Sequence, residues 1–476
     1  MKTLKWLICV GILAAAAAGC VYADEYRVSP GSLTRTVTDA KDGDVIILSE
    51  GVYDETNESF PIVLTSSVTL CAAEGESPVI DAPAFVPAVR IEADGVTITD
   101  LDIRFRRTGL YALGDDMTVE NCRISLADPA WRTSSCGVWT GGIYRAAFRS
   151  CDFTECGIAL AGPPVSESSK NIPVLTGLFE VGEDAGYFTS HEITDCTVNG
   201  KTLFYAVNQE SVTAPSDAGL ILIANCSNVV IEDTDVSYSS MGMEIAYCDH
   251  VSVERCKADC CGVFGIYLAK NSSGELVECS SEGTNHGLDI RASSDISLIG
   301  CRADKCDQGL FFSKVERGLM IDCKVSSTGQ GYFMAGGSQC QIRNCEAIEC
   351  ENGFNIQKEN DVLITGCFLK ENTICAARLD GSDVIFSGNT MEDNWVSIMA
   401  YGNVNFNITD NVIKNSGSCG LYLRDIAFSR ISGNTIDGSA NNSVEACGEM
   451  SGTLLADNVI DKEIVLNDGA VFRIIQ

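Results

Sequence analysis

The sequence predicts an all-β protein built as a solenoid, with one coil for about every 22 residues. Val, Ile, Thr, Ser, Asn, Asp and Gly dominate the chain, and this composition favours strands and turns. A cysteine also recurs at steps of 22 or 23 residues and is then replaced by asparagine in the same position of the repeat. The series consists of Cys256, Cys279, Cys301, Cys323, Cys345, Cys367, Asn389, Asn411 and Asn434. A step held for so long indicates one coil per step, because a solenoid grows by adding coils and not separate cores.

Each predicted coil contains two clear strands and a shorter third strand. Residues 286–291 and 296–299 alternate apolar and polar side chains, as half-buried strands do, and Cys301 follows the second of them. Neighbouring coils are expected to stack about 4.8 Å apart, which is the ordinary spacing of paired strands. The repeat therefore outweighs the two or three globular domains that 476 residues would otherwise suggest.

The N-terminal residues have the pattern of an export signal. Lys2 and Lys5 precede the apolar run 7–18, and Val21-Tyr22-Ala23 fits the small-x-small cleavage rule, so residues 1–23 are predicted to be a signal peptide. Lipid attachment at Cys20 is a second, less favoured reading. No later stretch reaches about 18 consecutive apolar residues, so no other membrane span is expected. The protein is therefore expected to be secreted, or to lie at the cell surface or in the periplasm.

The remaining chain divides into two predicted regions. Residues 24–88 contain a short amphipathic helix and several short strands, and they are expected to form an N-terminal cap with the first coils. Residues 89–476 are expected to form the main solenoid. A loop excursion is predicted around 163–217, where Pro163-Pro164 and several Ser, Glu and Gly residues are typical of loops.

The charge of the chain limits its partners. The formal net charge is −32, with an isoelectric point of about 4.3. Such a surface repels nucleic acid and anionic membranes, so neither is an expected partner. It also disfavours polyanionic substrates unless a local basic patch offsets the field. A monomer is the default expectation.

The repeated cysteines are expected to be buried thiols and not disulfides. Side chains at equivalent positions of stacked coils run parallel about 4.8 Å apart, whereas a disulfide needs converging Cβ atoms near 3.8 Å. The asparagines that follow would form a hydrogen-bonded amide stack. A second set, at Cys156, Cys261, Cys306 and Cys350, lies five residues after the repeated position, and isolated disulfides there remain an alternative. No metal site is expected, because no Cys-x-x-Cys unit occurs and the chain has only three histidines.

Two segments carry a family resemblance. Residues 199–209 and 218–229 resemble a segment of right-handed parallel β-helix proteins, specifically the NosD-like group and the carbohydrate-binding and sugar-hydrolysis (CASH) type of the pectin-lyase-like superfamily. The cap, from 43–53 to 79–81, is similar to the start of such proteins. The resemblance implies a single-stranded right-handed parallel β-helix. It does not imply one activity, because this superfamily includes lyases, hydrolases, epimerases and adhesins.

The outer face of the first strand of each coil is the predicted site. Reading coil by coil gives the outward column Glu244, Tyr267, Asp289, Phe311, Phe333 and Asn355, with Arg291 two residues beyond Asp289. Acids, an arginine and aromatic rings on one flat sheet suit a sugar chain, so Tyr267, Phe311, Phe333, Asn355 and the nearby His286 are predicted to bind substrate. The alternative is that these are scattered surface groups, or that the rings lie under loops.

The same column supplies the candidate catalytic residues Asp289, Arg291 and Glu244. Glu244 and Asp289 lie two coils apart, about 9.6 Å between backbones, which would suit an inverting glycosidase. Elimination from a uronate would need a base such as Arg291 and cation assistance, for which Ca²⁺ is a candidate. The motifs of the polygalacturonase-type helices are absent as a set, since Asn285-His286-Gly287 is only a fragment of one.

The leading functional hypothesis is an exported β-helix protein that binds extracellular or cell-envelope polysaccharide, with cleavage as an open question. One alternative is a polysaccharide lyase or glycoside hydrolase acting on uronate-type glycans. Another is a structural or adhesive surface protein without catalysis. The glycan itself cannot be identified from the sequence.

Overall fold

The computed structural model describes residues 23–164, 182–402, 404–471 and 473–475. The described chain is a parallel β-solenoid, so the predicted fold class is confirmed. Its helices are α1 (Leu33–Asp39), the 3-10 turn η1 (Pro129–Trp131) and α2 (Gly186–Thr189). The predicted signal peptide and Cys20 lie outside the described residues, as does the central part of the predicted loop excursion. Within the described residues, no helix is long and apolar enough to cross a membrane.

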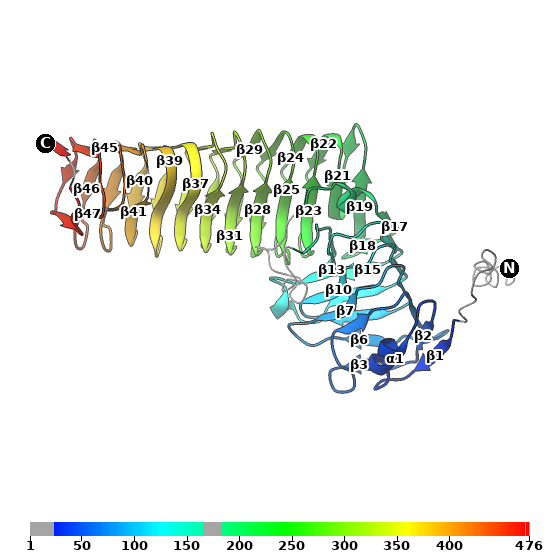
Figure 1. The fold of residues 1–476 in the computed structure, drawn as a ribbon. Coiled ribbons are helices and arrows are strands. Elements are labelled where there is room, and N and C mark those ends of the chain that lie inside the picture. The colour runs from blue at the N-terminus through cyan, green and yellow to red at the C-terminus, as the bar shows by residue number, and fades with distance from the viewer. Residues whose placement is uncertain (1–22, 165–181, 403, 472, 476) are drawn as a thin grey trace.

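Figure 1 shows two β-helical arms that meet at an angle near β17, β18 and β19, and not the single straight rod that the repeat suggests. The N-terminal arm has three parallel sheets. The first consists of β1 (Glu25–Val28), β2 (Val45–Leu48), β5 (Thr69–Ala72), β8 (Thr97–Thr99), β11 (Thr118–Glu120), β14 (Ala147–Arg149) and β17 (Glu192–Thr194). The second consists of β3 (Val52–Asp54), β6 (Val79–Asp81), β9 (Asp102–Phe105), β12 (Arg123–Leu126), β15 (Asp152–Thr154) and β18 (Thr197–Val198). The third consists of β4 (Ile62–Leu64), β7 (Pro87–Ile91), β10 (Thr108–Ala112), β13 (Cys136–Thr140) and β16 (Ile158–Ala159).

The C-terminal arm also has three sheets, which we call front, rear and third. The front sheet contains β19 (Lys201–Val207), β21 (Ala218–Ala224), β23 (Met241–Ala246), β25 (Phe264–Ala269), β28 (His286–Arg291), β31 (Gln308–Ser313), β34 (Gln330–Ala335), the first halves of β37 (Asn352–Thr365) and β39 (Cys375–Ser387), β41 (Val396–Tyr401), β44 (Leu421–Arg424), β47 (Val444–Cys447) and β50 (Ile464–Asn467). The rear sheet contains β20 (Val212–Thr213), β22 (Ser227–Glu232), β24 (Asp249–Glu254), β26 (Gly274–Val277), β29 (Ile296–Ile299), β32 (Leu319–Ile321), β35 (Gln341–Arg343), the second halves of β37 and β39, β42 (Asn407–Thr409), β45 (Arg430–Ser432), β48 (Leu454–Ala456) and β51 (Arg473–Ile475). The third sheet contains β27 (Ser280–Glu282), β30 (Arg302–Asp304), β33 (Lys324–Ser326), β36 (Glu346–Ile348), β38 (Phe368–Lys370), β40 (Thr390–Glu392), β43 (Val412–Lys414), β46 (Thr435–Asp437) and β49 (Val459–Ile460).

The bend between the arms coincides with a reversal of the chain. β18 and β19 pair antiparallel through a two-residue turn, whereas the other strand pairs within the described residues are parallel. Asn199 and Gly200 form that turn with φ values of 52° and 76°, both in the left-handed region. An Asn-Gly turn with positive φ at both residues is typical of tight hairpins. The winding therefore restarts after Gly200 in a new direction.

The repeated cysteines follow the rear strands and lie buried along the C-terminal arm. Backbone hydrogen bonds keep them in step; for example, the Lys324 N–H donates to the Cys301 carbonyl at 2.9 Å. All cysteines of the described residues are free. Burial raises the pKa of the Cys261 thiol, from the second set, to about 12, so this thiol stays protonated at neutral pH. The thiol state in solution stays a prediction.

The asparagines that continue the cysteine series form a stack of side-chain amides. The Nδ2 of each residue donates to the Oδ1 of the next, at 3.1 Å from Asn389 to Asn411 and 2.9 Å from Asn411 to Asn434. The stack also includes Asn458, which accepts from Asn434 at 2.8 Å and was not part of the predicted series. Each amide thus gains a partner inside the solenoid, which offsets the cost of burying it.

Two apolar cores fill the molecule. One runs through the interior of the C-terminal arm. The other fills the N-terminal arm and extends to outward-facing front-sheet side chains, including Leu222, Tyr267 and Ala269. The N-terminal arm therefore rests on the outer face of the first front strands. This contact decides which part of the predicted site is open to solvent.

Candidate functional site

The front sheet aligns the predicted site residues in one column. Strand pairing places Glu244 beside Tyr267, Tyr267 beside Asp289, and Asp289 beside Phe311 in successive coils. Phe333 and Asn355 follow in the next two coils. The column continues with Arg378, Met399 and Tyr422.

The beginning of this column is not open to solvent, contrary to the prediction. Glu244 and Tyr267 are buried, because β16 of the N-terminal arm lies against β23. The Leu160 N–H of the arm donates to Glu244 Oε2 at 3.0 Å. Burial raises the pKa of the Glu244 carboxyl well above its ordinary value and so favours its neutral form. Glu244 joins the two arms and is not placed to meet a substrate.

Asp289, His286 and Arg291 form a compact polar cluster. Asp289 is fully buried, and its Oδ1 accepts from Arg291 Nε at 2.8 Å while its Oδ2 lies 2.6 Å from His286 Nδ1. Burial raises the pKa of the Asp289 carboxyl, but the charge of Arg291 and the hydrogen bond to His286 outweigh burial and hold that pKa below its ordinary value. Asp289 is therefore an anion that orients Arg291. The structure thus buries Asp289 where the sequence suggested an outward side chain, and its catalytic role stays a prediction.

Arg291 lies among aromatic rings at the edge of the covered region. Its guanidinium carbon is 5.3 Å from the ring centre of Phe264, 5.8 Å from that of Tyr267 and 5.2 Å from that of Phe311. These distances permit cation–π attraction to each ring. Arg291 is partly exposed, so it is the member of the predicted catalytic set that reaches the surface.

Phe311 and Phe333 are half-buried and stack in parallel. Their ring centres are 4.6 Å apart with an angle of 4° between the planes. Each ring covers a face of the other, and Arg291 lies over the Phe311 ring. The faces that the two rings turn toward each other are therefore not available for stacking on a sugar, and their role in binding stays a prediction. The pair instead presents an apolar, half-exposed surface on the front sheet.

Side-chain amides lie beyond the two rings, where Asn355 is buried and Gln330 and Gln357 are partly exposed. Asn355 Nδ2 donates to Gln330 Oε1 at 2.7 Å, and Gln357 Nε2 donates to Asn355 Oδ1 at 3.1 Å. Gln330 and Gln357 were absent from the predicted binding residues. Continuing the 22-residue step from Arg291 leads to Gln357, and the same step from His286 leads to Gln330.

We define the amide strip as the outward side chains of β31, β34 and the first half of β37. They are Gln308, Phe311, Ser313, Gln330, Phe333, Ala335, Asn352, Asn355 and Gln357. None of these nine is a carboxylate. The cations Arg291, Lys314, Lys358 and Arg378 border the strip. The acids around the strip are Asp289, which is already paired with Arg291, Asp380 in the next coil, and the exposed Asp307 and Glu351, which directly precede Gln308 and Asn352.

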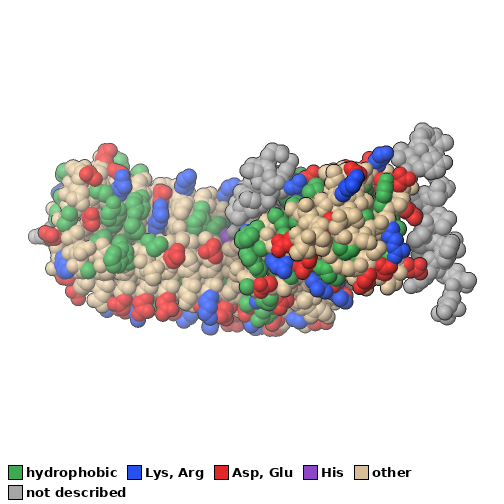
Figure 2. Space-filling view, turned by 90° about the horizontal axis from the view of Figure 1, so that it is seen from below, with side chains coloured by type: hydrophobic (Ala, Val, Ile, Leu, Met, Phe, Trp, Pro, Cys, Tyr) green, Lys and Arg blue, Asp and Glu red, His purple; other side chains and the backbone are tan. Residues whose placement is uncertain are grey.

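The surface beyond the strip is apolar. Cys375, Val396 and Cys419 form a small buried cluster with Met399 and Tyr422 packed against it. Figure 2, which shows the molecule from below, has hydrophobic side chains gathered on the C-terminal arm toward its C-terminal end. Within the described residues, no group of three His, Cys, Asp or Glu side chains could hold a metal ion. Ca²⁺ as a cofactor stays a prediction.

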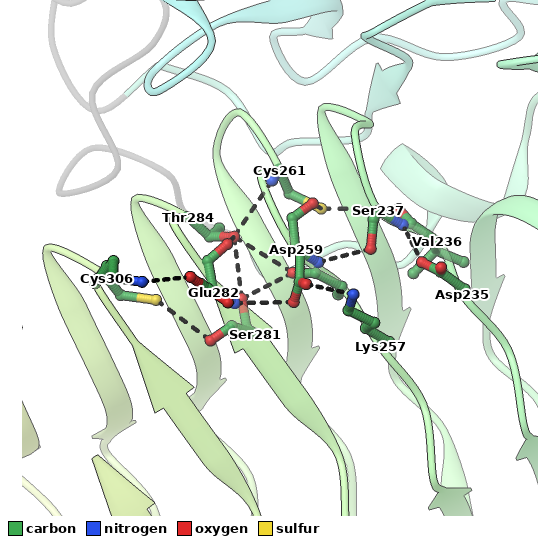
Figure 3. A network of polar contacts seen from close by, with 12 residues as sticks. Asp235, Val236, Ser237, Lys257, Asp259, Cys261, Ser281, Glu282, Thr284 and Cys306 are labelled. Atoms are coloured by element: carbon green, nitrogen blue, oxygen red, sulfur yellow. Dashed lines mark hydrogen bonds and ion pairs between the residues drawn. The ribbon is translucent and has the colours of Figure 1, made fainter. Parts of the chain in front are cut away.

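A second polar network connects neighbouring coils along the third sheet, in and around the segments that lead into the front strands (Figure 3). Asp259 forms an ion pair with Lys257 at 2.7 Å and accepts from the Glu282 N–H at 3.0 Å. The Asp259 N–H donates to Ser237 Oγ at 2.9 Å. The Asp259 carboxylate thus connects successive coils, so it is a weaker candidate for binding a ligand than the amide strip.

The fold and the strip define a right-handed parallel β-helix protein with a polar outer sheet. The family model described as "Right handed beta helix region" matches residues 187–331 and 315–460, so the chain belongs to this family. The NosD-like subgroup stays a prediction. No curated protein sequence matches the chain.

Solved structures of low similarity include three named proteins. The periplasmic alginate epimerase AlgG is 11% identical, with 91% of this chain and 85% of that chain covered and a TM-score of 0.26. A PL6 alginate lyase in complex with a trisaccharide is 9% identical, with coverages of 95% and 86% and a TM-score of 0.25. PfbA, a surface adhesin of Streptococcus pneumoniae, is 10% identical, with coverages of 84% and 86% and a TM-score of 0.22. At these identities and TM-scores, the three structures support no inference about what this chain binds.

Proposed function

We propose that this protein binds an acidic polysaccharide along the amide strip, outside the cell or in the cell envelope. The observation that carries the proposal is local charge. A chain of net charge −32 presents a sheet surface without carboxylates, bordered by Arg291, Lys314, Lys358 and Arg378. A basic border on an acidic protein concentrates an anionic ligand at that place.

The chemistry of the strip suits uronate sugars. Arginine and lysine bind carboxylates through charge-assisted hydrogen bonds, and glutamine and asparagine side chains can both donate to and accept from hydroxyl groups. The step from Arg291 to Arg378 crosses four coils, or on the order of 19 Å at the ordinary strand spacing. That length accommodates a short run of sugars lying along the rod.

The geometry favours binding over cleavage. Inverting hydrolysis requires two carboxyl groups that flank the bond. Glu244 is covered by the N-terminal arm, and Asp289 is buried with both oxygens occupied. Neither carboxyl group can flank a sugar on the strip. Two alternatives to a binding protein remain to be tested: a polysaccharide lyase or glycoside hydrolase, and a structural protein that binds no glycan.

The direct test is calorimetric titration of the full mature chain with oligogalacturonate and with alginate oligosaccharides. The double variant Lys314→Ala/Lys358→Ala should bind at least one of these about tenfold more weakly, since each lost cation contact costs on the order of 0.5–1 kcal/mol. The matched control is Lys324→Ala, an exposed lysine of the third sheet that pairs with Glu346.

Each result discriminates among the hypotheses. Binding that the strip variant weakens and the control leaves unchanged supports the proposal. Equal loss in both variants would show general charge attraction instead. Ultraviolet absorbance from unsaturated uronates after incubation would favour a lyase. An absence of both binding and product would favour the structural role.

A further inference from the structure

A groove on the N-terminal arm has the features of a second ligand site. It lies where β3, β6 and β9 end and has a volume of about 520 Å³. Its lining residues are Asp54, Glu55, Thr56, Asp81, Pro83, Ala84, Phe85, Arg106 and Trp131. A groove with aromatic walls and a few polar groups is the usual form of a small-ligand site.

Two aromatic rings form one wall of this groove. The Phe85 and Trp131 ring centres are 4.8 Å apart, and the planes are nearly perpendicular at 88°. Phe85 is 70% exposed, the second most exposed of the described large apolar residues. An edge-to-face pair leaves most of the outer ring uncovered, so Phe85 can contact a flat apolar ligand surface.

The backbone holds Phe85 in this exposed position at a conformational cost. Its φ is 74°, in the left-handed region that bulky residues avoid. Loops of the fold place Asn, Asp or Gly at many positions of this kind. A strained, exposed phenylalanine stabilises neither the backbone nor the core, and Phe85, unlike Phe428, also lines a groove beside a second aromatic ring, which points to contact with a ligand.

The polar groups of the groove determine the ligand's charge. Asp81 Oδ1 accepts from Arg106 Nη1 at 2.9 Å, and Arg106 also donates to the Ala82 carbonyl. The guanidinium of Arg106, the one arginine that lines the groove, is therefore already paired with Asp81. Asp54 and Glu55 remain as additional negative groups on the rim. An anionic sugar would be repelled here, whereas sugar hydroxyls can donate to carboxylate oxygens.

We propose that this groove binds a neutral hexose unit of a glycan, with the apolar face of the sugar on Phe85 and its hydroxyls on the carboxylate rim. This site is separate from the amide strip and prefers the opposite class of sugar. The inference does not depend on acidic-polysaccharide binding by the front sheet. A protein with both sites would bridge a neutral and an acidic glycan.

The test follows tryptophan fluorescence during titration with cellohexaose, mannohexaose and oligogalacturonate. Trp395 is exposed on the other arm, so the Trp395→Phe background leaves Trp131 as the half-exposed reporter, with Trp139 buried. Phe85→Gly removes the ring and suits the positive φ, so this variant should keep or raise the thermal midpoint. The matched control is Phe428→Gly, since Phe428 is 67% exposed with a φ of 51° and lies outside the groove.

We expect at least one neutral hexasaccharide to change the Trp131 emission, and Phe85→Gly to weaken its binding at least about tenfold. Phe85→Tyr should restore binding, and Phe428→Gly and Lys314→Ala/Lys358→Ala should leave it unchanged. Failure of both neutral chains to bind at millimolar concentration would overturn the inference. Equal effects of the two glycine variants, or oligogalacturonate binding that requires Phe85, would also overturn it. Failure of the strip proposal would appear separately, as an absence of oligogalacturonate binding in the calorimetric titration while the neutral hexasaccharide still binds.

Discussion

The replacement Glu359→Gln should make the stability of this protein less sensitive to pH. Glu359 lies in β37 at an irregularity in the strand register, and its side chain is turned into the solenoid with a relative exposure of 1%. Oε1 accepts from the Gly337 N–H at 2.7 Å, whereas Oε2 has no hydrogen-bond partner within the described residues. Gly337 makes room for this carboxyl, because a Cβ there would lie 3.1 Å from Oε2.

Burial raises the pKa of Glu359 from 4.5 to about 7. Below about pH 4.5 the carboxyl is protonated in both the folded and the unfolded chain, so it adds no pH dependence. Between pH 4.5 and 7 the unfolded chain releases a proton that the folded chain keeps, and the free energy of unfolding falls by about 1.4 kcal/mol per pH unit. The total loss is about 3 kcal/mol, and it levels off above pH 7.

Glutamine has nearly the same shape and does not titrate. The difference in unfolding free energy, variant minus wild type, should therefore rise by about 3 kcal/mol between pH 4 and pH 8. Urea unfolding at both pH values, followed by circular dichroism with the slope held in common, measures this difference. Glu349→Gln, at an exposed position in the turn after β36, is the control for the substitution itself and should change urea stability little. If the Glu359→Gln difference is the same at both pH values, the carboxyl is not held protonated and the reasoning fails.

Three further predictions concern the stacked interior. Asn411→Ala should lower the unfolding free energy by about 3 kcal/mol, because the Asn389 amide loses its acceptor and buried groups are left unpaired. The matched control Asn441→Ala, at an exposed position without a positive φ, should change urea stability little. Cys323→Ser should cost about 1 kcal/mol by placing a hydroxyl in an apolar stack, and an equally stable serine variant in the same assay would contradict this. Thiol titration in denaturant should give the same count with and without reductant for the chain that begins at residue 24, whereas a lower count without reductant would reveal disulfides.

The architecture of the C-terminal arm was predictable because a solenoid repeats one local pattern. The step between Cys301 and Cys323 equals one coil, so it determines the register of every strand between them. The same step predicts which side chains share the outer column. Strand pairing from Asp289 to Phe311 and Phe333 follows directly from this arithmetic.

The bend was not predicted, although the sequence contains a signal for it. Asn199-Gly200 is a strong hairpin turn, but it lies in a segment that was interpreted through its family resemblance. The contact between Leu160 and Glu244 joins residues 84 positions apart. No local pattern reports such a contact, so the burial of Glu244 could not be predicted from periodicity alone.

The bend also explains where the amide strip begins. A straight β-helix would leave the whole outer column open, including Glu244 and Tyr267. The N-terminal arm covers that end. Arg291 is therefore the first charged side chain within the outward columns that reaches solvent. Asp289 is fully buried and needs Arg291 as its counter-ion, and this pairing in turn fixes the guanidinium at the border of the strip. The arm therefore covers Glu244 at the start of the column, while the buried Asp289 orients the cation with which the proposed glycan site starts.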